Sequence, residues 1–134
     1  MVKEPDEVRI LALAPVEVQA QIRRQLGAIG AAVDFIGNAN DLHRLALSRV
    51  LYHVALLPAA LPDTGWWALW GEITLLNPRP EILVYAHTAS FELWSGVLEL
   101  GGYDVLVEPF TDEEIQGAVL NAAQSFRERE NVQE

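Results

Sequence analysis

The sequence lacks cysteine, is poor in basic residues and contains no long hydrophobic run. Without cysteine, disulfides, thiolate nucleophiles and cysteine-ligated zinc are excluded. The chain has nine lysine and arginine residues and nineteen acidic ones. Its formal net charge of -10 repels nucleic-acid backbones and anionic lipid. No apolar stretch approaches the length that spans a bilayer, and the amino terminus shows no signal-peptide pattern. We therefore expect a cytoplasmic protein that binds neither nucleic acid nor membranes.

The overall amino-acid composition is that of a folded protein. Hydrophobic residues make up 51% of the 134 residues and charged residues 21%, which is typical of a globular domain. No linker, repeat or low-complexity segment divides the chain. We expect a single domain over residues 1–134, with a core from about residue 8 to residue 127 and a frayed polar tail over 128–134.

Short aliphatic runs alternate with longer segments of helical period, a pattern typical of βα units around a parallel sheet. The predicted strands cover residues 8–13, 31–36, 54–57, 81–86 and 104–107. The predicted helices begin near Pro15, at Asn40 or Asp41, at Trp66, at Phe91 and at Thr111. Strand 54–57 is apolar throughout, so we expect it at the centre of the sheet. Thr111 and Glu114 have the spacing of a capping box.

Several stretches of this pattern, in order and at matching spacing, resemble the receiver domain of two-component response regulators. RILALAP is similar to the first strand of the family, and VALLPAALP to the third strand with its leucine-proline step, here Leu61-Pro62. PEILVYA and GGYDVLVEPF are similar to the fourth and fifth strands. The resemblance runs from about residue 8 to residue 127. It implies a three-layer, doubly wound α/β fold of the flavodoxin type, with five helices around a parallel sheet of order 2-1-3-4-5.

The resemblance also implies a reactive crevice at the carboxyl ends of the strands, where this sequence departs from the family. In active receivers, acidic residues after the first strand and an aspartate after the third hold Mg²⁺, and that aspartate accepts the phosphoryl group. A serine or threonine and a lysine complete the site. The matching positions in this chain are Ala14, Pro15, Pro58, Tyr85 and Glu108. Because these residues cannot hold the metal or accept phosphate, the chain is interpreted as a degenerate receiver, or pseudo-receiver.

The crevice offers little for catalysis. His87 and Glu108 follow the fourth and fifth predicted strands and could form an acid-base pair, although an exposed histidine and a solvated glutamate fit the sequence better. P-loops, dinucleotide fingerprints and nucleophile elbows are absent. We expect no enzymatic activity, no metal site and no cofactor. By resemblance to the family, we also expect the Glu108-Pro109 peptide bond to be cis.

Tryptophan is concentrated in the third and fourth predicted helices. One or two of these side chains could anchor the core, but adjacent tryptophans on a helix cannot be buried equally. Exposed tryptophan is enriched in protein interfaces. The helix that begins at Phe91 also carries more apolar residues than one buried stripe needs. The candidate interaction surface comprises Trp66, Trp67, Trp70, Phe91, Leu93, Trp94, Val97 and Leu98.

Three functions remain open from the sequence. The leading hypothesis is a phosphorylation-independent interaction module in signal transduction. It would bind a signalling partner through the surface of the third to fifth helices. It would form a homodimer through the fourth helix, fifth strand and fifth helix, the face that active receivers use. The alternative is a module that binds a small molecule in the emptied crevice near Pro58, Tyr85 and His87. The third hypothesis is a phosphoacceptor at another residue, such as Asp63.

Overall fold

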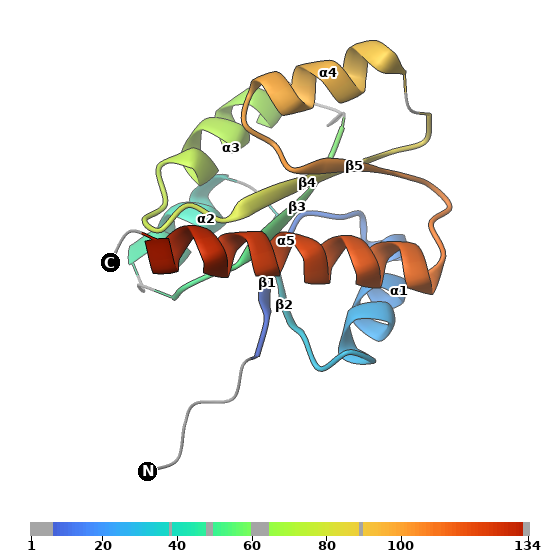
Figure 1. Ribbon diagram of the computed structural model, residues 1–134, viewed down its shortest axis with the longest axis horizontal. Helices are drawn as coiled ribbons and strands as arrows, with labels where there is room; N and C mark the ends of the chain where they lie inside the picture. The colour runs from blue at the N-terminus through green and yellow to red at the C-terminus, as the bar shows by residue number, and fades with distance from the viewer. Residues whose placement is uncertain (1–6, 38, 48–49, 60–64, 89, 133–134) are drawn as a thin grey trace.

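The computed structural model of the protein describes residues 7–37, 39–47, 50–59, 65–88 and 90–132. Within these segments, five strands form one parallel sheet of order β2-β1-β3-β4-β5, with helices on both faces (Figure 1). The strands are β1 (Arg9–Ala12), β2 (Ala32–Phe35), β3 (Val54–Pro58), β4 (Glu81–Ala86) and β5 (Asp104–Val107). The helices are α1 (Val16–Gly27), α2 (Ala39–Leu47), α3 (Gly65–Thr74), α4 (Phe91–Glu99) and α5 (Asp112–Val132). The fold and strand order predicted from the sequence are confirmed.

Different helices cover the two faces of the sheet, and β3 shows this residue by residue. Val54 and Leu56 belong to a core cluster with residues of α1 and α5, whereas Ala55 and Leu57 belong to a second cluster with residues of α2, α3 and α4. All four side chains are fully buried. Since successive side chains of a strand point to opposite faces, a strand covered on both sides must be apolar throughout. β3 therefore occupies the central place predicted for it.

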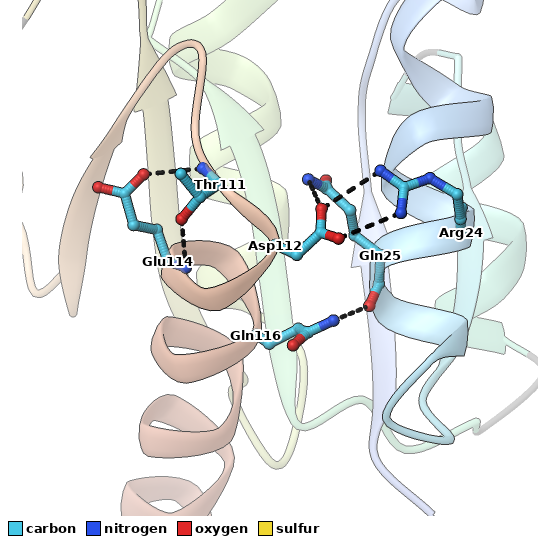
Figure 2. Close-up of polar contacts among 6 residues, drawn as sticks. All are labelled: Arg24, Gln25, Thr111, Asp112, Glu114 and Gln116. Atoms are coloured by element: carbon cyan, nitrogen blue, oxygen red, sulfur yellow. Dashed lines mark hydrogen bonds and ion pairs between the residues drawn. The ribbon is translucent and has the colours of Figure 1, made fainter.

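The last helix begins at the predicted cap but extends further than predicted. The backbone N–H of Thr111 donates to the Glu114 carboxylate at 2.7 Å, and the N–H of Glu114 donates to the Thr111 hydroxyl at 3.1 Å (Figure 2). α5 continues to Val132, so residues 128–132, which were expected in the polar tail, lie in the helix. Arg129 lies 5.1 Å from the Phe126 ring centroid and 3.7 Å from the Glu81 carboxylate. The contact with Glu81, the first residue of β4, ties the last turns of the helix to the sheet.

The start of α5 is held against α1 by polar contacts that no helical pattern predicts (Figure 2). The Arg24 guanidinium donates two hydrogen bonds of 3.2 Å to the Asp112 carboxylate, and the Gln25 amide donates another of 2.9 Å. The Gln116 amide donates to the Gln25 carbonyl at 2.8 Å. The hydrogen bonds from Arg24 and Gln25 lower the pKa of Asp112. The carboxylate therefore stays ionised at neutral pH and fixes the first turn of α5 beside α1.

After α4 the chain reverses over two glycines. Gly101 has a φ of 93°, in the left-handed region that other residues avoid. The N–H of Gly102 donates to the Val97 carbonyl at 2.8 Å. A Cβ added at Gly102 would lie 2.9 Å from that carbonyl oxygen and 3.2 Å from the Trp70 ring. The close approach therefore requires glycine at this position and packs the turn against both Val97 and Trp70.

Candidate functional site

The positions that the sequence singled out converge at the carboxyl ends of the strands. Ala14 and Pro15 follow β1, Pro58 ends β3, Tyr85 lies next to the end of β4, and Glu108 follows β5. The parallel register pairs Pro58 with Tyr85, and the N–H of Glu108 donates to the Ala86 carbonyl at 2.7 Å. All five side chains line one cavity of about 820 Å³, together with His87. Segments far apart in the sequence therefore build a single site.

The cavity has further walls that sequence reasoning missed. Phe35 and Ile36 contribute from the end of β2, Val18 from α1, and Leu93 from the start of α4. The predicted strand over residues 31–36 was the available signal for Phe35 and Ile36. The carboxyl ends of parallel strands lie at one edge of the sheet, so the end of this strand had to lie near the site. Apolar side chains form most of the wall, and the crevice has not collapsed onto Tyr85.

Tyr85 forms part of the wall and is itself part of the core. Its hydroxyl donates to the Leu13 carbonyl at 2.7 Å, and its ring meets the Phe110 ring edge-on at a centroid distance of 6.3 Å. Only 3% of the residue is exposed. Burial, and to a smaller extent the neighbouring Glu108 carboxylate, raises the pKa of Tyr85. The phenol therefore stays neutral and bridges β4 to the segment after β1.

Glu108 and His87 come together at the cavity, as the sequence suggested they could. The His87 Nδ1 lies 3.6 Å from a Glu108 carboxylate oxygen. The two side chains differ in burial, since that of His87 is 89% exposed and that of Glu108 only 18%. The Glu108-Pro109 peptide bond is cis, as expected. The carboxylate therefore faces an apolar cavity with an exposed imidazole as its neighbour.

Across the described segments, no group of three or more histidine, aspartate and glutamate side chains is placed to hold a metal ion. No helix of the described segments is both long and apolar enough to cross a membrane.

Two residues named from the sequence motifs, Leu61 and Pro62, and the alternative phosphoacceptor Asp63 lie outside the described residues.

The candidate interaction surface divides into exposed and buried members. Phe91 is 77% exposed, Trp94 45% and Leu98 37%, and the Phe91 and Trp94 ring centroids lie 6.4 Å apart. These residues are spaced at i, i+3 and i+7, so they form one strip along α4. Leu93 is half-buried and lines the cavity.

Two members of the predicted surface do not belong to it. Trp70 is 5% exposed and Val97 2%, so their assignment to an interaction surface is wrong. Both pack in the core cluster on the α2–α3–α4 face of the sheet, where the Gly102 turn covers them. The side chains of Trp66 and Trp67 lie outside the described residues.

Several solved structures with the same fold are receiver domains. The receiver domain of an HD domain-containing protein from Pseudomonas fluorescens Pf-5 matches with a TM-score of 0.75 and 18% identity, over 91% of this chain and 98% of its own. A CheY-like receiver domain protein from Methanospirillum hungatei JF-1 matches with a TM-score of 0.76 and 17% identity, over 92% and 99%. The beryllofluoride-activated NtrC4 receiver domain dimer matches with a TM-score of 0.76 and 17% identity, over 88% and 98%. No family profile and no curated protein matches the sequence.

Proposed function

We propose that the protein is a non-enzymatic, cytoplasmic signalling module of the receiver fold that acts without phosphorylation. It docks on a protein partner and on a second copy of itself through α4, β5 and α5. The observation that supports the proposal is the composition of the strand-end site. By the resemblance to receivers, Ala14, Pro15, Pro58 and Tyr85 occupy positions where an active receiver has its reactive residues. This makes the domain a pseudo-receiver.

The residues at four of the five strand-end positions each lack a group that phosphoryl transfer requires. Mg²⁺ is bound by hard oxygen ligands, and Ala14 and Pro15 have no side-chain oxygen. Pro58 has no nucleophilic atom with which to accept a phosphoryl group. The Glu108 carboxylate adds negative charge where the transferred phosphate needs a cation. The site therefore supports no phosphorylation cycle.

Restoring the nucleophile alone is expected to leave the protein unable to accept phosphate. The wild-type protein and Pro58→Asp, incubated with Mg²⁺ and acetyl phosphate, should both keep their unmodified intact mass, because neither holds the metal and both keep Glu108. An active receiver domain treated in parallel confirms that the donor works. Efficient Mg²⁺-dependent labelling of Pro58→Asp would contradict this account of the site. A stable adduct on the wild-type protein, at Asp63 or elsewhere, would contradict phosphorylation independence.

Exposed apolar side chains support the proposed docking face. Phe91, Trp94 and Leu98 project from α4, and Val107 at the end of β5 is 43% exposed. Aromatic residues supply a large share of the binding energy at interface centres. The structurally similar NtrC4 receiver domain is a dimer in its beryllofluoride-activated form. We infer that this chain dimerises by burying the α4 strip.

Removing the aromatic side chains of α4 is expected to dissociate the dimer. Light scattering coupled to size-exclusion chromatography, without any phosphodonor, should give a dimer for the wild-type protein. Phe91→Ser and Trp94→Ser should each raise the dimer dissociation constant by about tenfold or more, the loss typical of a buried aromatic anchor. Leu47→Ser is the matched control, because Leu47 is 72% exposed but lies on α2. A monomeric wild-type protein, or a dimer that both α4 variants leave intact, would refute this interface.

Binding of a small molecule is a second candidate function, and the cavity favours it. Its volume of about 820 Å³ falls within the range of roughly 300–1,000 Å³ that ligand pockets occupy. Its walls are mainly apolar, with a few polar groups, which is the usual make-up of such pockets. An uncharged aromatic probe, 2-naphthaleneethanol, should therefore shift the amide resonances of the lining residues. Absence of such shifts at millimolar probe would remove this function.

A further inference from the structure

We propose that the ligand of the strand-end cavity is an organic cation. Its hydrocarbon or aromatic body would fill the apolar part of the cavity, and its ammonium or amidinium group would pair with the Glu108 carboxylate. The inference rests on the proposed small-molecule function of the cavity and adds the chemical class of the ligand.

The walls of the cavity select an apolar body. Leu13, Val18, Phe35, Ile36 and Leu93 contribute aliphatic and aromatic surface from four separate elements or their ends. Burying such surface is favourable at roughly 25 cal/mol for each Å² removed from water. A strongly hydrated molecule without apolar surface would gain none of this. The body of the ligand is therefore hydrocarbon or aromatic.

Two of the polar side chains in the wall, Tyr85 and Gln19, already donate hydrogen bonds within the protein. The Tyr85 hydroxyl donates to the Leu13 carbonyl at 2.7 Å. The Gln19 amide donates to the Ala14 carbonyl at 2.9 Å. A ligand therefore cannot gain these donors without breaking existing hydrogen bonds, and its polar group must be recognised elsewhere in the cavity.

Glu108 is the charged group that remains for recognition. Its side chain is only 18% exposed, and no arginine or lysine is among the described residues that line the cavity. The Nδ1 of the neighbouring His87 lies 3.6 Å from a Glu108 carboxylate oxygen, which is longer than a hydrogen bond, and the His87 side chain is 89% exposed. A carboxylate removed from water is stabilised by a cation and destabilised by an anion. Charge complementarity therefore selects a positively charged headgroup and rejects carboxylates and phosphates.

A matched series of probes separates charge from shape. The series consists of 2-(2-naphthyl)ethylamine, protonated at neutral pH, the uncharged 2-naphthaleneethanol and the anionic 2-naphthylacetate, which share one aromatic body. Amide-shift titrations at about 150 mM salt, where the Debye length is about 8 Å, limit non-specific attraction to the acidic protein. We expect the amine to bind about tenfold tighter than the alcohol, and the acetate to bind weakest. The shifts should map to the residues that line the cavity.

Two substitutions test the role of the carboxylate. Glu108→Gln should reduce the preference for the amine over the alcohol to near one, because the variant no longer carries the negative charge that attracts the amine. Glu113→Gln, at an exposed site in the first turn of α5, makes the same change in net charge and should leave the preference intact. Ala14→Trp, which fills the cavity, should abolish binding of all three probes; Ala59→Trp serves if that variant does not fold.

The outcomes distinguish the ligand class from the cavity function. Equal binding of amine and alcohol, or an amine preference that survives in Glu108→Gln, would overturn the organic cation while leaving a ligand-binding cavity. Failure of every probe to shift the lining residues would overturn both. Loss of the amine preference in Glu113→Gln would show that net charge, and not Glu108, selects the cation.

Discussion

Replacement of Gly102 by alanine is expected to lower the free energy of unfolding by about 3 kcal/mol, the upper part of the range for overpacked positions. The new Cβ would lie 2.5 Å from the Val97 Cγ1 and 2.9 Å from the Val97 carbonyl oxygen. A side chain can change its rotamer, but the carbonyl oxygen belongs to the last turn of α4 and accepts the Gly102 N–H at 2.8 Å. Relief of the clash therefore requires movement of the helix or the turn. Urea unfolding followed by circular dichroism measures the loss.

Gly96→Ala is the matched control for that substitution. Gly96 lies inside α4, and a Cβ added there meets nothing within 4 Å. Because alanine has the higher helix propensity, this variant should gain about 0.5 to 1 kcal/mol. If Gly102→Ala unfolded at the same urea concentration as the wild-type protein, the close packing of the turn on Val97 and Trp70 would be contradicted.

Tyr85→Ala is expected to lower the free energy of unfolding by about 3 to 5 kcal/mol, as for other buried aromatic residues replaced by alanine. The substitution removes a side chain that is 3% exposed and packs on Phe110. Tyr85→Phe separates the hydroxyl from the ring. It should cost about 1 to 2 kcal/mol, because the buried Leu13 carbonyl loses its donor at 2.7 Å. Thermal and urea unfolding of both variants measure these losses.

The pH dependence of the Tyr85→Phe difference provides a further check. Burial raises the pKa of Tyr85, so the folded protein holds the phenolic proton more tightly than the unfolded chain does. The stabilisation should be fully present below about pH 10, the ordinary pKa of tyrosine, and should decline as the pH rises above that value. A difference that changes between pH 6 and pH 9 would argue against a neutral, hydrogen-bonded phenol.

The fold was predictable because the information for it is local and repetitive. An apolar run such as Val54 to Leu57 predicts a strand covered on both faces, and the structure places it at the centre of the sheet. The capping box of Thr111 and Glu114 depends on residues three positions apart. The full length of α5 was not predictable in this way. It depends on contacts of Arg129 with Glu81 and Arg79, which lie about fifty residues away in the sequence.

The site was predictable in its strand-end positions but not in its shape. Resemblance of the motifs to receiver strands located Pro58, Tyr85 and Glu108, and all of them line the cavity. The walls from Phe35 and Val18 were missed, because an unfilled volume depends on the packing of every neighbouring element. No single motif encodes that volume.

The rotation of α4 about its own axis could not be predicted from the sequence either. In a helix of nine residues, apolar positions at 91, 93, 94, 97 and 98 allow more than one orientation. Contact of the Gly102 turn with Val97 selects the orientation in the structure, with Val97 inward and Phe91 and Trp94 outward. Helical periodicity alone could not assign these residues correctly.

Because α4 is anchored to the sheet through its inner side, the residues on its outer side can be substituted without loss of that packing. Val97 and the adjoining turn hold the helix on the sheet, while Phe91 and Trp94 contribute little to the core. Substitutions at these outward positions should therefore change the exposed surface of the domain with small effects on folding. That separation makes α4 a suitable place to build a new binding surface by design, with the scaffold left unchanged.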